Sequence, residues 1–203
     1  AVNRGPGRLA VEEVPVPTPA ADQVLVEVDL CGVCGTDIHM TLDGWATPGS
    51  WGGHEWTGTV VEVGTAADRW RVGDAVVGAL APRCGTCAPC RDGRSSLCLH
   101  RDEPGAPPRP GAFATYIAAP ADDLVARPDG LDPRAAALTE PLAVALHAVA
   151  LGGGRPGHRT MVLGAGPIGA LAVVALRAAG AASVTVVEPG DDRRDLEIGR
   201  AHV

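Results

Sequence analysis

Four cysteines in one short run constrain this chain more than any other feature. Cys84, Cys87, Cys90 and Cys98 lie in CGTCAPCRDGRSSLC, with the spacing C-x2-C-x2-C-x7-C. Four thiolates at such spacing can close a tetrahedron around Zn2+, and because no ligand position stays open, the predicted site is structural. A pair of disulfides or an iron–sulfur centre are the alternatives. No signal-peptide pattern opens the sequence, so we expect metal binding in a reducing cytoplasm.

A second, looser group of metal-binding residues precedes this run. His54 lies twenty residues after Cys34, with two glycines directly before it and Glu55 directly after it. A thiolate, an imidazole and a carboxylate suit a Zn2+ site that keeps one position open. A lone buried cysteine is usually only a small hydrophobic residue, so the prediction depends on all three. Cys31 forms C-x-x-C with Cys34, but the βαβ unit typical of a redox pair does not follow.

A glycine-rich loop predicts a dinucleotide site. GAGPIG stands between a strand pattern and a helix pattern, and its cofactor-binding residues would be Gly164, Gly166, Pro167, Ile168 and Gly169. Such glycines permit the tight turn and bring a pyrophosphate to the helix N-terminus. Glu188 ends the next strand pattern, where a carboxylate can accept both ribose hydroxyls and so favours NAD. A solvated strand end is the alternative for Glu188, while Arg193 and Arg194 leave NADP open.

The pattern of strands and turns predicts two domains. Short alternating runs such as VLVEVDL and WTGTVVEVG predict a mostly-β domain over residues 1–151, a partly open barrel of short strands. Within it, Asp132-Pro133 opens an Ala-rich helical stretch. The run from Met161 predicts a strand, a glycine turn, a helix and a second strand. Residues 152–203 are therefore expected to hold the first β-α-β of a Rossmann domain.

Composition and charge exclude several classes of protein. A net charge of −7 argues against a nucleic-acid partner and against an anionic membrane surface. The apolar run MVLGAGPIGALAVVALRAAGA approaches the length of a membrane span, but glycines, a proline and an arginine interrupt it, so a soluble strand and helix are expected. Aromatic residues make up only 3% of the chain, so Val, Leu, Ala and Ile must supply most of the core.

Taken in order, the motifs resemble those of one family. CGVCGTDIH, GGHEWTGTVVEVG, the four-cysteine lobe, EPLAVALHAV and VLGAGPIG are similar to motifs of the zinc-containing medium-chain dehydrogenases. The EPLAVALHA stretch looks most like the sorbitol and polyol branch, with threonine dehydrogenase close by. The resemblance covers the chain to about Leu196 and implies a GroES-like barrel followed by an NAD(P)-binding Rossmann domain, together an α/β plus mostly-β protein.

The resemblance also implies roles for individual residues. Cys34 and His54 match catalytic zinc ligands, and Glu55 matches a carboxylate that acts as a ligand or supports one. Glu140 matches a carboxylate that replaces a third protein ligand or holds the zinc-bound water. Thr36 matches the hydroxyl that hydrogen-bonds the substrate alcohol. Two further matches are Asp37, the carboxylate that orients the zinc-bound histidine, and His39, the end of a proton relay to solvent.

These roles together predict a reaction. The full-length protein to which this chain belongs is expected to transfer a hydride between an alcohol or polyol CH–OH group and NAD(P). It would hold one catalytic and one structural Zn2+ per chain. We expect a small-molecule substrate, no nucleic-acid or membrane partner, and a homodimer or homotetramer. The alternative function is a non-catalytic zinc-binding fragment or zinc-ribbon module, for which a titration would find one zinc per chain instead of two.

The last residues carry a separate expectation. EIGRAHV, residues 197–203, resembles the in-frame translation of a common sequencing adapter, AGATCGGAAGAGCACACGTCTGA. A complete dinucleotide domain needs about six strands, whereas the sequence pattern here supplies two. We therefore expect a C-terminally truncated fragment of a longer enzyme, inactive by itself.

Overall fold

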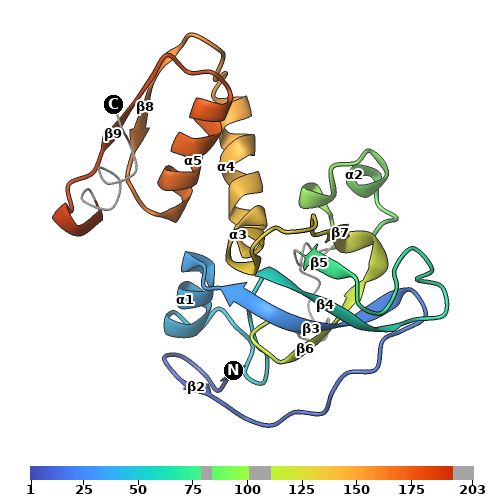
Figure 1. Ribbon diagram of the computed structural model, residues 1–203. Coiled ribbons are helices and arrows are strands. Elements are labelled where there is room, and N and C mark those ends of the chain that lie inside the picture. The colour runs from blue at the N-terminus through green and yellow to red at the C-terminus, as the bar shows by residue number, and fades with distance from the viewer. Residues whose placement is uncertain (79–83, 101–110, 194–203) are drawn as a thin grey trace. The chain divides into compact units, whose positions relative to one another are not determined.

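A five-stranded antiparallel sheet organises the first part of the chain (Figure 1). The structure is a computed structural model that describes residues 1–78, 84–100 and 111–193. Arg194 and the expected adapter-derived residues 197–203 lie outside the described residues. The strand order is β6-β3-β4-β5-β7, and the order does not close into a ring within the described part of the chain. The expectation of a mostly-β, partly open first domain is confirmed.

The strands of this sheet alternate with short helices and turns. The sheet strands are β3 (Gln23–Gly32), β4 (Glu55–Val63), β5 (Ala75–Gly78), β6 (Tyr116–Pro120) and β7 (Leu124–Ala126). Two very short strands, β1 (Val2–Asn3) and β2 (Leu9–Ala10), pair with each other. The helices and 3-10 turns of this part are α1 (Gly35–Leu42), α2 (Ala88–Arg91), η1 (Ser95–Leu97), η2 (Ala121–Asp123) and α3 (Pro133–Ala137).

The core of the sheet is built mainly from small aliphatic residues, as the composition predicts. Val24, Val26 and Val60 are fully buried, together with Trp56 on β4. Gly78 is the cross-strand partner of Trp56, and a Cβ at Gly78 would overlap the Trp56 indole. A glycine is therefore required where the large ring crosses the neighbouring strand.

A β-α-β unit forms the second part of the chain. Strands β8 (Arg159–Leu163) and β9 (Ser183–Val187) are parallel, and helix α5 (Pro167–Ala178) connects them, as the sequence predicts. In this unit α5 packs against both strands and against α4 (Thr139–Leu151) (Figure 1). The run that imitates a membrane span is thus a strand, a turn and a short helix. Among the described residues, no helix has both the length and the hydropathy to cross a bilayer.

The two units divide between Leu138 and Thr139. The expected helix after Asp132 is present, and the Asp132 side chain caps it by accepting from the Arg134 N–H at 2.7 Å. The Ala-rich stretch forms two helices, α3 and α4, instead of one. Because α4 packs on α5, it groups with the second unit, and the division lies earlier than the boundary expected near residue 152.

Candidate metal and cofactor sites

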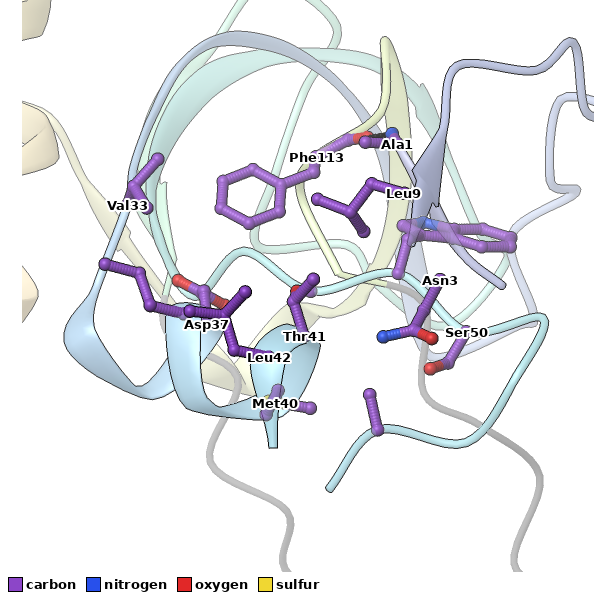
Figure 2. Close-up of a pocket in the computed structure, with 14 residues that line it drawn as sticks. Ala1, Asn3, Leu9, Val33, Asp37, Met40, Thr41, Leu42, Ser50 and Phe113 are labelled. Atoms are coloured by element: carbon purple, nitrogen blue, oxygen red, sulfur yellow. Dashed lines mark hydrogen bonds between the residues drawn. The ribbon is translucent and has the colours of Figure 1, made fainter. Parts of the chain in front are cut away.

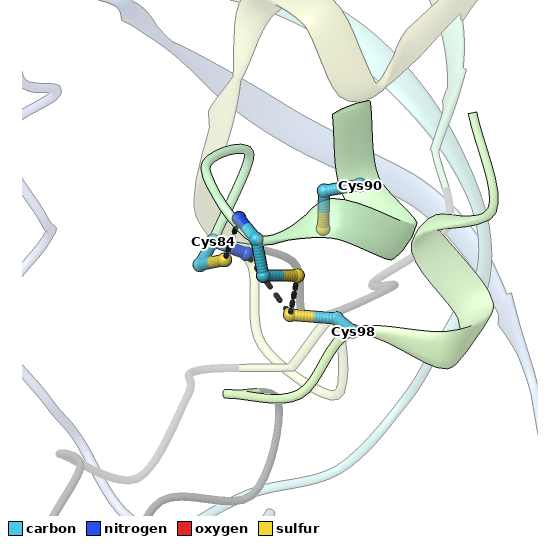
Figure 3. A group of neighbouring side chains, drawn as sticks. Cys84, Cys90 and Cys98 are labelled. Carbon is cyan, nitrogen blue, oxygen red and sulfur yellow. Dashed lines mark hydrogen bonds between the residues drawn. The ribbon is translucent and has the colours of Figure 1, made fainter. Parts of the chain in front are cut away.

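The four cysteines of the predicted structural site converge. Their sulfur atoms all lie within 4.8 Å of one another, and Figure 3 shows Cys84, Cys90 and Cys98 facing a common centre. All six cysteines of the chain are free thiols, so none of the three C-x-x-C spacings forms a disulfide. Four thiolates around one point form a donor set that fits tetrahedral Zn2+ with no open position. The geometry therefore fits the structural zinc site expected from the spacing.

Backbone N–H groups already point at these sulfurs. Cys84 Sγ accepts from the N–H groups of Thr86 at 3.4 Å and Cys87 at 3.3 Å. A hydrogen bond from the Thr86 hydroxyl, with these two N–H groups, lowers the pKa of Cys84 to about 5. Burial instead raises the pKa of Cys90 to about 11. Hydrogen-bond donors directed at a sulfur stabilise the thiolate, which is the form that binds a metal. The N–H groups around Cys84 therefore favour its metal-binding form.

The second candidate site joins the end of β3 to the start of β4. Ligand atoms of Cys34, His54 and Glu55 lie within 4.8 Å of one another, and all three residues are half-buried. Cys34 caps helix α1, and its Sγ accepts from the Thr36 N–H at 3.5 Å. A soft sulfur, an imidazole nitrogen and a carboxylate oxygen form a three-donor set suited to Zn2+ with a further position open.

Asp37 connects the two segments that carry these ligands. Its Oδ2 accepts from the Cys34 N–H at 2.9 Å, and its Oδ1 accepts from the Gly53 N–H at 3.2 Å. The same Oδ1 lies 3.7 Å from His54 Nδ1. The carboxylate is buried, and this position beside the imidazole fits the orienting role that the family resemblance implies for it.

The glycines before His54 have a steric purpose. A Cβ at Gly52 would lie 2.7 Å from Asp37 Oδ1. Gly53 has φ of +97°, and a Cβ there would lie 2.7 Å from the Phe113 nitrogen and 2.8 Å from Cys31 Sγ. Burial raises the pKa of Cys31 to about 12, so this thiol stays protonated near neutrality. Close packing around the metal-binding segments therefore explains why two glycines precede the histidine.

Helix α1 also carries two of the predicted catalytic residues. Thr36 and His39 lie in this helix, which the sequence analysis did not anticipate, and both are exposed. His39 Nδ1 lies 2.8 Å from Asp43 Oδ2, and its ring stacks on Trp45 with centroids 5.3 Å apart. Glu140 lies in the first turn of α4, in the second unit. The roles of all three remain predictions.

An apolar cavity of about 450 Å³ lies along the other residues of α1 (Figure 2). Its lining includes Ile38, Thr41 and Leu42 of α1, together with Leu9 and Phe113. The three candidate zinc ligands do not line it, but Asp37 does. The buried carboxylate therefore borders this cavity and also contacts the metal-binding segments. No motif in the sequence indicates this cavity.

The glycine-rich loop has the geometry of a phosphate-binding turn. Gly164 has φ of +98°, and Gly166 is the N-cap of α5, with Pro167 at the first turn. A Cβ at Gly169 would overlap the carbonyl oxygen of Gly164. Gly166 has no side chain with which to cap α5, so a pyrophosphate can take the N–H groups at the helix N-terminus. Each glycine thus has a separate physical reason, as the motif predicts.

Glu188 lies beside this loop. One of its carboxylate oxygens accepts from the Ala165 N–H at 2.8 Å, and the other accepts from the Gly190 N–H at 2.8 Å. Both carboxylate oxygens of Glu188 therefore accept from backbone N–H groups, one of them in the glycine-rich loop. Arg193 extends to within 3.8 Å of the position that a Cβ would take at Gly166.

Comparisons with known proteins agree with this arrangement. Residues 20–129 match the alcohol dehydrogenase GroES-like domain. The chain belongs to the zinc-containing medium-chain alcohol dehydrogenase family. It is 40% identical to a sorbitol dehydrogenase of Halalkalibacterium halodurans, over 97% of this chain and 57% of that protein. It is 39% identical to an L-threonine 3-dehydrogenase of Saccharopolyspora erythraea, over 93% of this chain and 56% of that protein.

Solved structures of this dehydrogenase family share the fold. A zinc-binding dehydrogenase of Sinorhizobium meliloti, determined with NADP bound, superimposes with a TM-score of 0.90 at 37% identity. That superposition covers 98% of this chain and 58% of the other. The chain thus spans somewhat more than half the length of its dehydrogenase relatives, and the likeness to the sorbitol and threonine branch is confirmed.

Proposed function

We propose that the protein carrying this chain is a zinc-dependent oxidoreductase that transfers a hydride between an alcohol or polyol CH–OH group and NAD(P). The observation that carries the proposal is the convergence of Cys34, His54 and Glu55 from two separate segments. A binding module would need only the four-cysteine lobe, whereas a three-donor set with an open position is typical of catalytic zinc. The phosphate-binding geometry of the glycine loop supports a dinucleotide partner.

The metal supplies one element of this chemistry. Zinc lowers the pKa of a bound hydroxyl toward neutrality, so that an alcohol can lose its proton. We propose Cys34, His54 and either Glu55 or Glu140 as its ligands, and the four cysteines as holders of a second, structural zinc. Asp37 would hold His54 Nδ1, which leaves Nε2 to face the metal.

Two residues of α1 would move the substrate proton. We propose that the Thr36 hydroxyl hydrogen-bonds the substrate alcohol and that His39 passes the proton to solvent. The exposed side chain of His39 and its Asp43 partner support this order, because the relay must end at water. Thr36 stands two residues from Cys34, at the start of the same helix.

The cofactor would bind at the second unit. The glycine loop would hold the pyrophosphate, with Pro167 and Ile168 at the start of α5, and the carboxylate of Glu188 would accept the ribose hydroxyls. Such a carboxylate favours NAD, while Arg193 beside the loop leaves NADP as a second candidate. By the family resemblance, we also propose assembly as a homodimer or homotetramer.

Zinc content and hydride transfer test the proposal together. The gene product that contains this chain should bind two zinc ions and reduce NAD+ or NADP+ with sorbitol, other polyols or L-threonine. Cys34→Ser should abolish turnover and remove one zinc, and Thr36→Val should abolish turnover and keep both zincs. One zinc per chain, held only by the four cysteines, would instead support the zinc-ribbon alternative.

A further inference from the structure

Gly32 and Glu55 are directly opposite each other across two strands. Gly32 is the last residue of β3, Glu55 is the first residue of β4, and the two are partners in the antiparallel register. Side chains at paired positions lie on the same face of a sheet. A Cβ on Gly32 would lie 2.5 Å from Glu55 Oε2 and 3.2 Å from Glu55 Cβ. The Glu55 side chain therefore occupies the space that a side chain at position 32 would need.

The backbone does not explain this glycine. Gly32 is not one of the glycines with positive φ, so its conformation is open to any L-residue. Gly53, close by, differs because its φ is +97°. What Gly32 provides is space, and the group that uses this space is the carboxylate of a candidate zinc ligand.

The colliding atom also decides what a side chain at position 32 would change. Oε2 is the far end of a flexible side chain, which can rotate away at small cost. The Glu55 Cβ, at 3.2 Å, requires only a further shift of a few tenths of an ångström. The backbone pairing of β3 with β4 can therefore survive a small residue there. The same substitution would, however, displace the Glu55 carboxylate from its position beside Cys34 Sγ and the His54 ring.

We propose that Gly32 is a positioning residue for the Cys34, His54 and Glu55 site. Its bare Cα lets the Glu55 carboxylate fold over the end of β3 toward the other two ligands. Any side chain at position 32 turns the carboxylate away and leaves a two-donor site. The proposal rests on the proposed function, since it requires a metal at these three residues.

Cobalt(II) binding to the full chain tests this without any measurement of turnover. The four-cysteine site is first filled with one equivalent of zinc, and its protection is checked by the resistance of Cys84 to alkylation. Cobalt is then titrated, and the sulfur-to-cobalt charge-transfer band reports binding at Cys34. We expect Gly32→Ala to weaken cobalt binding about 10- to 100-fold, the usual cost of disturbing a group that supports a metal site.

Gly35→Ala is the matched control. Gly35 stands one residue after Cys34. Apart from its chain neighbours and the nearby backbone of α1, none of the described residues lies within 4 Å of the position of its Cβ. Gly35→Ala should therefore keep the cobalt affinity of the unsubstituted chain. In a Glu55→Gln background, Gly32→Ala should add less than about twofold, because both changes remove the same interaction.

Four other results would contradict the proposed role of Gly32. If the unsubstituted chain binds cobalt but Gly32→Ala binds it equally well, or if the two losses are additive, the role of Gly32 is wrong. A Gly32→Ala chain that loses its β-sheet circular dichroism would show a structural role instead. If the unsubstituted chain shows no cobalt band from Cys34, the dehydrogenase proposal fails, and the role of Gly32 fails with it.

Discussion

The two candidate zinc sites of this chain are built in opposite ways. The four-cysteine site takes all its ligands from one loop, Cys84 to Cys98, with a four-residue helix as its longest element. The other site takes Cys34 from the end of one strand region and His54 and Glu55 from the start of another. The first is organised by local spacing and the second by a sheet, a helix cap and a buried carboxylate.

This difference determines what each site depends on. Leu97 and Leu99, in and just after the four-cysteine loop, are exposed, and we expect bound metal to stabilise the loop against local unfolding. The Cys34 site rests on a packed sheet whose core includes Val24, Val26 and Trp56. Its architecture is expected to persist without metal, while its affinity depends on a few positioning contacts.

Loss of one cysteine from the loop should have the largest effect. Structural zinc sites bind with apparent free energies of about 10–16 kcal/mol, and Cys98→Ala removes one of four ligands. We expect this variant to lose one zinc per chain by elemental analysis and to be cleaved by proteases within the loop. Cys31→Ala is the control, since Cys31 belongs to neither ligand group, and it should keep the full zinc content. Full zinc retention by Cys98→Ala would contradict the predicted site.

Substitution of Gly53 should destabilise the sheet that supports the second site. A non-glycine residue at positive φ costs about 1–3 kcal/mol, and a Cβ at Gly53 would also meet the Phe113 backbone nitrogen at 2.7 Å. Gly49→Ala is the matched control, because Gly49 has φ of +90° but, apart from its chain neighbours, none of the described residues lies within 4 Å of a Cβ there. All four tryptophans belong to the first unit, so their fluorescence in urea reports its unfolding. Equal midpoints of urea unfolding for the two variants would show that the close packing of Gly53 against Phe113 does not affect stability.

Neutralising Asp37 should weaken the second site without removing a ligand. Asp37→Asn leaves a similar shape but loses the charge that contacts the Cys34 and Gly53 N–H groups and lies near His54. We expect zinc affinity to fall about 10- to 100-fold, measured against a chromophoric chelator. Asp43→Asn, an exposed carboxylate at the end of the same helix, should leave the affinity unchanged. An Asp37→Asn chain with unchanged affinity would remove the carboxylate from the site.

The smallest effect expected is a difference in thiol reactivity between the two regions. Cys84 has a pKa of about 5 and Cys31 a pKa of about 12. Because pH 7 lies above the pKa of Cys84 and below the pKa of Cys31, the Cys84 thiol is ionised and the Cys31 thiol is protonated. In the metal-free chain we expect iodoacetamide to alkylate Cys84 at least about tenfold faster, since the thiolate is the nucleophile. Alkylation of Cys84 should slow as the pH falls through 5, as peptide mass mapping can measure, and equal rates at pH 7 would contradict the predicted ionisation.

Much of the fold could be predicted because its signals are local. Alternation marked β3 and β4, the Asp132-Pro133 pair marked the start of α3, and GAGPIG marked the turn before α5. Helix α1 was missed because it is short and its N-cap is a cysteine, whose sulfur accepts from the Thr36 N–H. The break between α3 and α4 at Leu138 was missed because an Ala-rich run has the same helix propensity on both sides of it.

The sequence by itself determined the four-cysteine loop, the glycine turn and the donor types of both metal sites, because each depends on the spacing or identity of residues close along the chain. Only the tertiary structure decided that Asp37 joins the segments of Cys34 and Gly53, that Gly32 leaves room for the Glu55 carboxylate, and that Glu188 returns to the glycine loop. The physical reason is that strand register and helix position bring these groups together. No spacing in the sequence encodes a distance between residues on different strands.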